Sequence, residues 1–193
     1  MKYNAGNVFS VQCALRRIGV EAVITDDAEA LRRAEKVVFP GVGEASTAMA
    51  YLREHRIDEV IKSLTQPVLG ICIGMQLLCR SSEEGNTPCM GVFSTEVRRF
   101  SNAVCQDMKI PHMGWNTLRV AQPNPLIAER LNDAYVYYVH SYYAPVCADT
   151  VAVTDYITPF SAALHHHNFY ATQFHPEKSG DVGETILKQF LAL

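Results

Sequence analysis

Apolar residues in the first part of the chain follow helical and then strand-like spacing. Four of them recur at helical spacing before Gly19: Val8, Val11, Leu15 and Ile18. This spacing predicts a helix that ends at the glycine. Residues 20–24, apolar except for Glu21, predict a strand, and Asp26 or Asp27 is placed to cap a short helix after it.

The same alternation of helix and strand continues to the middle of the chain. Val37–Phe39 and Val68–Ile71 are short apolar runs of the kind found in buried strands. Between them, residues 44–64 have helical spacing with a break near His55. Strands that alternate with helices predict an α/β protein with a doubly wound, mostly parallel sheet, in which sites lie at the carboxyl ends of strands.

Strand-like runs dominate the C-terminal half. They are residues 92–100, 115–120, 135–143, 151–156, 160–164 and 169–174. We expect them to add antiparallel strands to a flavodoxin-like sheet. A final helix is predicted to begin near Asp181, and residues 81–88 are predicted to form a polar surface loop.

Composition narrows the class of protein. A length of 193 residues with 48% hydrophobic and 19% charged residues fits one domain over residues 1–193. The net charge of −3 and the lack of a basic run argue against nucleic acid or an anionic membrane as the main partner. No apolar stretch approaches the roughly 20 residues of a membrane span, and the first residues lack a secretory core. We therefore expect a cytoplasmic protein.

Cysteine and histidine spacing gives no sign of a metal site. The six cysteines, at positions 13, 72, 79, 89, 105 and 147, show no close pairing, so neither a zinc site nor a disulfide framework is predicted. Apart from Cys72, we interpret them as small buried hydrophobes. Residues 165–167 are three adjacent histidines, whose side chains would alternate between faces of a strand and could not converge on one ion.

Cys72 is the first candidate catalytic residue. It lies between Gly70 and Gly74, directly after the predicted strand Val68–Ile71. This arrangement is typical of a nucleophile elbow, in which a sharp strand-to-helix turn presents one side chain above the sheet. At a helix N-terminus, free N–H groups favour the thiolate and a developing negative charge on a substrate.

A base for this thiol follows the last predicted strand. In Gln173-Phe174-His175-Pro176-Glu177, the histidine and the carboxylate are two residues apart, so in an extended segment they point the same way. An imidazole can take the thiol proton and return it to a leaving amine, while a carboxylate orients the ring. The segment therefore predicts a Cys-His-Glu triad.

A third segment, Pro40-Gly41-Val42-Gly43, follows the strand Val37–Phe39. A glycine-flanked loop lets backbone N–H groups approach a substrate closely, as an oxyanion hole requires.

These three segments together resemble the class I (triad-type) glutamine amidotransferases, and the resemblance runs nearly end to end. Within that family the chain is most similar to the glutaminase subunits of imidazole glycerol phosphate synthases. Four further segments carry that finer resemblance: residues 3–7, 111–116, 137–142 and 178–180.

The resemblance implies a glutaminase of histidine biosynthesis that needs no cofactor. Glutamine would be hydrolysed through a γ-glutamyl thioester on Cys72. The ammonia would pass to a separate cyclase subunit with a (β/α)8 barrel fold, in a heterodimeric lyase-type synthase complex. The cyclase would use it to form imidazole glycerol phosphate and aminoimidazole carboxamide ribotide.

The resemblance also implies residue roles. Cys72 would be the nucleophile, His175 the general base and acid, and Glu177 its orienting partner. The backbone amides of Val42 and Ile73 would form the oxyanion hole. Glutamine would be held by Gly43, Gln76, Ser141 and Tyr142. The residues expected to face the cyclase are Asn7, Met113, Trp115, Tyr137 and Lys178. From the sequence alone, Trp115 and Tyr137 could equally be core aromatics, and Lys178 a solvated charge.

One departure from the family concerns its first strand. The family has a complete strand ahead of residues 4–7, whereas only Met1, Lys2 and Tyr3 stand there in this sequence. Losing an interior strand would remove a row of buried backbone hydrogen bonds, so we expect an omitted or altered segment rather than a functional variant.

Two alternatives share the same nucleophile. One is the glutaminase of another amidotransferase, for example one that serves pyridoxal phosphate synthesis. The other is a free-standing thiol hydrolase that needs no partner.

Overall fold

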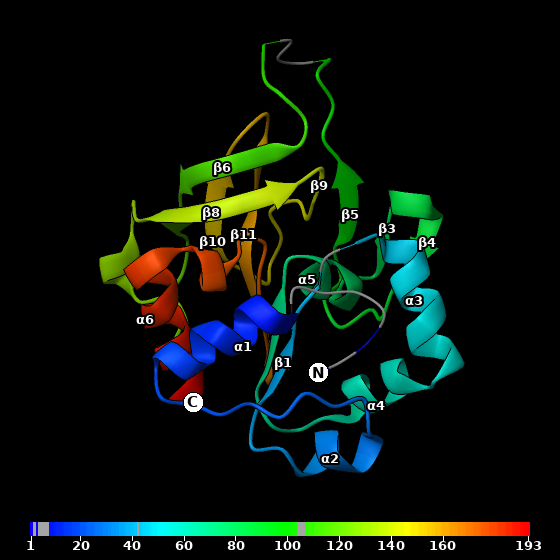
Figure 1. Cartoon of the computed structure of the whole chain (residues 1–193). Coiled ribbons are helices and arrows are strands. Elements are labelled where there is room, and N and C mark those ends of the chain that lie inside the picture. Colours follow the sequence, from blue (N-terminus) through cyan, green and yellow to red (C-terminus); the bar gives the residue numbers. More distant parts are fainter. Residues whose placement is uncertain (2, 4–7, 42, 104–106) are drawn as a thin grey trace.

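A six-stranded mixed sheet forms the centre of the molecule (Figure 1). The computed structural model describes residues 1, 3, 8–41, 43–103 and 107–193. In spatial order the strands are β1 (Val37–Phe39), β2 (Val68–Ile71), β12 (Phe169–Thr172), β11 (Pro159–His166), β10 (Thr150–Asp155) and β7 (Arg119–Val120). The first three are mutually parallel, and the others are added antiparallel.

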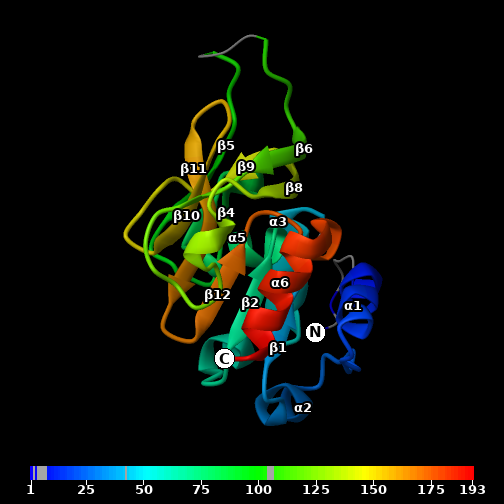
Figure 2. The ribbon, with the colours of Figure 1, turned by 90° about the vertical axis from the view of Figure 1, so that its left-hand side faces the viewer.

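Helices cover both faces of the parallel strands. One face carries α1 (Val8–Arg17) and α6 (Gly180–Leu191), which lie together in Figure 2. The other face carries α2 (Ala28–Arg33), α3 (Ala45–Glu54), α4 (Ile57–Ser63) and α5 (Ile73–Leu78). The predicted α/β fold class with antiparallel additions is therefore confirmed.

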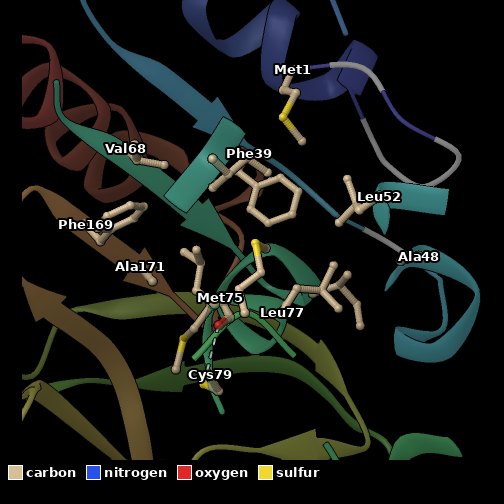
Figure 3. Close-up of a cluster of buried hydrophobic side chains, with 14 of the residues drawn as sticks. Met1, Phe39, Ala48, Leu52, Val68, Met75, Leu77, Cys79, Phe169 and Ala171 are labelled. Carbon is tan, nitrogen blue, oxygen red and sulfur yellow. Dashed lines mark hydrogen bonds between the residues drawn. The ribbon is translucent and has the colours of Figure 1, made fainter. Parts of the chain in front are cut away.

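Alternation along the strands divides the buried side chains into two cores. Phe39 and Val68 face the core beneath α3 to α5, where Figure 3 shows Phe39 near Leu52 and Met75. Leu69 and Ile71 face the opposite core, beneath α1 and α6. Because β2 is buried on both faces, its sequence is continuously apolar.

The remaining strands form two smaller sheets. β6 (His112–Thr117) and β8 (Tyr135–His140) form an antiparallel ribbon. A second small sheet has the order β4 (Thr87–Pro88), β3 (Ser81–Ser82), β5 (Glu96–Arg99) and β9 (Tyr142–Tyr143). The 3-10 helices are η1 (Glu84–Asn86), η2 (Glu129–Leu131) and η3 (Pro176–Lys178).

Several local predictions agree with the structure. The predicted strands Val37–Phe39 and Val68–Ile71 are β1 and β2. The side chain of Asp27 caps α2 by accepting a hydrogen bond from the backbone N–H of Ala30. The break near His55 is real, because Arg56 adopts a left-handed conformation (φ 54°) between α3 and α4.

The predicted strand at residues 20–24 is wrong. This segment is irregular, and Val23 is 80% exposed. A strand needs a hydrogen-bonding neighbour, and among the described strands β1 pairs only with β2. An apolar cavity of about 600 Å³, lined by Val20, Ala22 and Val38, lies between the segment and β1.

Other boundaries also differ from the prediction. Residues 81–88 are not a simple surface loop, because β3, η1 and β4 lie there and Ser82 and Thr87 are buried. Of the run 92–100, only Glu96–Arg99 is a strand. The run 115–120 is divided between β6 and β7. In each case hydrogen bonds to a neighbouring strand determine where the strand begins and ends. The hydropathy pattern along the sequence does not contain that information.

Candidate active site

Cys72 lies in a strained turn between β2 and α5. Its backbone has φ 53° and ψ −107°, an unfavourable conformation for a residue with a side chain. Both sides of the turn are fixed: the Cys72 N–H donates to the carbonyl of Thr172 on β12 (2.8 Å), and the Cys72 carbonyl accepts from the N–H of Gln76 (3.1 Å). The predicted elbow is therefore present, with the thiol at the start of α5.

Gly74 allows α5 to lie against the sheet. A Cβ atom at this position would overlap the backbone carbonyl of Phe39 at the end of β1. The glycine after Cys72 is thus required by close packing between a helix and a strand.

His175 and Glu177 form a buried pair behind the cysteine. His175 Nδ1 lies 2.8 Å from Glu177 Oε1, and both side chains are 1% exposed. The backbone N–H of His175 donates to the carbonyl of Tyr137 (2.9 Å), which ties the end of β12 to β8. Glu177 comes from η3, the short helix that Pro176 begins.

The surroundings of His175 favour its charged form. Burial lowers its pKa, but interactions with Cys72 and then with Glu177 outweigh burial and raise the pKa to about 10. Within the described residues, His175 Nε2 is buried without an aligned hydrogen-bond partner. The imidazolium is thus stabilised from two sides, by Cys72 and by the Glu177 carboxylate that accepts from Nδ1.

A cavity of about 340 Å³ opens beside the sulfur. Its lining contains Cys72 and His175 together with the four residues expected to bind glutamine: Gly43, Gln76, Ser141 and Tyr142. Ile73, the first residue of α5, also lines it. Val42, the other expected oxyanion donor, lies outside the described residues.

Glu84 is a cavity residue that the sequence interpretation missed. It lies on η1, lines the same cavity, and accepts a hydrogen bond from the backbone N–H of Ala45 at the start of α3 (2.8 Å). Burial raises the pKa of this carboxyl. A carboxylate here can bind an ammonium group, but an acidic residue within an apparent surface loop gave no signal of that role.

His140 lines the cavity, and a second buried histidine, His112, lies against it. His140 Nδ1 lies 2.7 Å from the carbonyl of Tyr142, and its Nε2 lies 3.2 Å from His112 Nδ1. Burial lowers the pKa of His112 to about 4 and that of His140 to about 3, so both are neutral at pH 7. With neutral rings, His112 donates to His140, and His140 donates to the carbonyl.

The expected partner residues gather on one face of the β6–β8 ribbon. Met113 is 66% exposed and Trp115 is 55% exposed, so the alternative that Trp115 is a core aromatic is wrong. Trp115 packs edge-to-face with the half-buried Tyr137, and Lys178 Nζ lies 5.8 Å from the centre of the Tyr137 ring. Tyr135, 61% exposed on the same face, was not predicted. Asn7 lies outside the described residues.

Neither a metal cluster nor a membrane-spanning helix is found in the described part of the chain. No group of three histidine, cysteine or acidic side chains there is arranged to hold a metal ion. None of the described helices is long and apolar enough to cross a bilayer.

Comparison with known proteins identifies a family and relatives that match nearly the whole chain. A family model described as glutamine amidotransferase class-I matches residues 3–193. The imidazole glycerol phosphate synthase subunit HisH of Bacteroides fragilis is 60% identical over 193 residues, covering 100% of this chain and 97% of the relative. The subunit of the same name from Bacteroides thetaiotaomicron is 58% identical over 194 residues, again covering 100% and 97%.

Solved structures share the fold at lower identity. A glutamine amidotransferase crystal structure matches with a TM-score of 0.74 at 21% identity, covering 97% of this chain and 94% of that chain. A glutamine amidotransferase of Thermotoga maritima matches with a TM-score of 0.62 at 19% identity, covering 97% of this chain and 75% of that chain.

Proposed function

The chain belongs to the class I glutamine amidotransferase family, and from this premise we propose that Cys72, His175 and Glu177 hydrolyse glutamine in it. Its function is that of the glutaminase subunit of imidazole glycerol phosphate synthase, in histidine biosynthesis. The observation that carries the proposed chemistry is the buried His175–Glu177 pair, 2.8 Å apart, beside the thiol at the mouth of a cavity.

The reaction begins with proton transfer from the Cys72 thiol to His175 Nε2. The thiolate attacks the side-chain amide carbon of glutamine, and the oxyanion that forms is stabilised by backbone N–H groups of Ile73 and Val42. His175 then gives its proton to the leaving nitrogen, the C–N bond breaks, and ammonia leaves a γ-glutamyl thioester on Cys72. Water, deprotonated by His175, attacks the thioester and releases glutamate.

Charge complementarity positions the substrate. Glu84 faces the cavity with a carboxylate that can bind the α-ammonium group of glutamine. Gln76, Ser141 and Tyr142 supply polar groups at the same cavity, and Gly43 brings the backbone close to it.

The partner in this proposal is the cyclase, whose (β/α)8 barrel forms a heterodimer with the chain in the cytoplasm. The exposed face of β6–β8 supports this, because Val139 lines the cavity and pairs with the exposed Met113. Ammonia released at Cys72 therefore has a short route to a protein docked on that face.

The test compares two nitrogen sources in the synthase reaction. Cys72→Ala, combined with the cyclase, should lose glutamine-dependent product and keep ammonium-dependent product, because only the thioester step needs the sulfur. Equal loss of both would contradict the division of labour. The matched control, Cys13→Ala, changes a half-buried cysteine of α1 and should retain both activities.

The two alternatives predict other results. A free-standing thiol hydrolase would cleave glutamine equally well with and without the cyclase. Full-length identity of 60% to a HisH protein favours this synthase over the glutaminase of pyridoxal phosphate synthesis.

A further inference from the structure

Gln173 is a fully buried amide that the reaction described so far does not use. It follows β12, two residues before His175, and its side chain is 0% exposed. Its backbone N–H donates to the carbonyl of Ala162 on β11 (2.8 Å), which fixes its position. Glutamine is mostly exposed in proteins, and an unpaired buried amide costs about 1–3 kcal/mol. A polar side chain at this depth therefore needs partners.

The partners are Gln76 and the nucleophile. Gln76 Nε2 donates to the backbone carbonyl of Tyr142 (2.9 Å) and to Gln173 Oε1 (3.0 Å). Gln173 Nε2 lies 3.7 Å from the sulfur of Cys72, within hydrogen-bonding distance for sulfur.

The backbone carbonyl sets the orientation of both amides. The Tyr142 carbonyl can only accept, so the NH2 group of Gln76 must face it. The second N–H of Gln76 then needs an acceptor, which places the oxygen of Gln173 towards Gln76 and the NH2 group of Gln173 towards the sulfur. Because both N–H groups of Gln76 are used, its Oε1 is left to accept from a substrate in the cavity.

We propose that Gln173 takes part in the reaction by donating an N–H to the Cys72 sulfur, which favours the thiolate, while its carbonyl holds Gln76 ready for substrate. This inference rests on the proposed glutaminase function. A hydrogen bond to an ionised acceptor is about twice as strong as one to a neutral acceptor, so the contact favours thiolate over thiol. Gln173 gives up no proton, and His175 remains the acid and base.

Two substitutions test this inference through the pH dependence of alkylation. Gln173→Glu keeps the shape of the side chain but replaces the N–H donor with an oxygen, and Gln173→Met keeps only its approximate size. Iodoacetamide modification of Cys72 would be followed by peptide mapping across a pH series. In Gln173→Met we expect the pH of half-maximal alkylation rate to rise by about one unit, because the thiolate has lost a donor. In Gln173→Glu it should rise further, because a carboxylate then also lies beside the sulfur.

Steady-state kinetics give a second readout. For Gln173→Glu, kcat/KM for glutamine should fall at least about 100-fold, with most of the loss in kcat, since the nucleophile is affected more than binding. Gln66→Glu is the matched control: its side-chain amide donates to the carbonyl of Leu31 (2.7 Å), and Gln66 does not line the cavity. That control should keep the wild-type alkylation profile.

A purely structural role for Gln173 predicts a different pattern. Thermal stability would then fall in Gln173→Met while the alkylation profile of Cys72 stayed at the wild-type pH, and that result would overturn the inference. If Gln173→Met does not fold, Gln173→Leu, which also lacks a donor and adds no charge, carries the test. Alkylation does not require glutamine. If the wild-type chain with its cyclase hydrolysed no glutamine, while the Gln173 variants still shifted the alkylation profile, the proposed function would be refuted and the role of Gln173 would stand.

Discussion

The charge state of His175 connects the buried pair to the first step of catalysis. Its raised pKa of about 10 means that, at neutral pH, a proton on the imidazole is favoured while Cys72 and Glu177 lie beside it. The proton that His175 takes from Cys72 is therefore held on the ring until it is returned to the leaving nitrogen. Glu177 contributes by keeping that charge stable in a site where burial opposes it.

Removing the charge of Glu177 should therefore slow chemistry more than binding. For Glu177→Gln we expect kcat for glutamine to fall by roughly 10²- to 10⁴-fold, with a smaller change in KM, because the imidazolium loses its carboxylate. Steady-state kinetics of the complex with the cyclase measure both. Glu129→Gln, on the exposed side of η2, is the control and should behave as wild type. An unchanged kcat in Glu177→Gln would remove Glu177 from the triad.

His112 and His140 should make the fold sensitive to acid. Their pKa values, about 4 and about 3, lie below the ordinary value of 6.5. Between these values, the two histidines bind protons in the unfolded chain but not in the folded chain. The free energy of unfolding is therefore highest above pH 6.5 and falls as the pH decreases towards 4. Between pH 6.5 and 5, each histidine should contribute a loss of about 2 kcal/mol.

Urea unfolding at the two pH values measures this loss. His112→Phe keeps a ring to stack on Tyr138 and Tyr156 but removes one titrating group, so its decrease in unfolding free energy should be smaller than that of wild type. An equal decrease in both proteins would show that His112 is not responsible.

Residues with strong local constraints could be predicted from the sequence, whereas residues defined by contacts could not. Cys72 stood out through its flanking glycines, and His175 with Glu177 through their spacing after a strand. Glu84 and Gln173 carry no such signal. Their importance depends on which distant segments the fold brings beside them, namely the start of α3 for Glu84, and Cys72 with Gln76 for Gln173.

At the level of elements, the site depends on how closely α5 packs against β1. The free energy of unfolding of Gly74→Ala should be lower than that of wild type by at least about 2 kcal/mol, because the added methyl group would overlap the carbonyl of Phe39. It should also lower glutaminase activity, since α5 carries Ile73 and Gln76. Chemical denaturation and kinetics of the same samples provide the measurement.

Gly19→Ala is the matched control for that substitution. Gly19 has φ 84° but nothing within 4 Å of an added Cβ, so only backbone strain is introduced, at a cost of about 1 kcal/mol. Equal losses of stability at the two positions would show that close packing of Gly74 against Phe39 does not add to the cost of the substitution.

Elements with internal signals were predicted well. β2 is an uninterrupted apolar run buried on both faces, and α3 and α4 have clear helical spacing with a break between them. Residues 20–24 have the composition of a strand, but a strand also requires a neighbour. Local pattern could not show that the space beside β1 is a cavity in the described structure.

At the scale of the whole molecule, the exposed face of the β6–β8 ribbon is the surface proposed to bind the second subunit. Trp115→Ala should weaken binding to the cyclase at least about tenfold, because a half-exposed tryptophan on an apolar face is a typical binding hot spot. Calorimetric titration of the two proteins measures the affinity. Val146→Ala, at an apolar position 50% exposed outside the ribbon, should leave the affinity unchanged. The same affinity in Trp115→Ala would place the interface elsewhere.

The edge of the central sheet at β1 has a consequence for handling the purified protein. In the described structure the three residues of β1, Val37–Phe39, pair with β2 on one side; on the other, the Met1 amino group donates to the Val38 carbonyl (3.0 Å) and the rest of the edge adjoins the apolar cavity. An apolar strand edge of this kind can serve as a template for strands of other molecules. Concentrated or warmed solutions should therefore lose monomer through slow intermolecular sheet growth, while dilute solutions should remain clear.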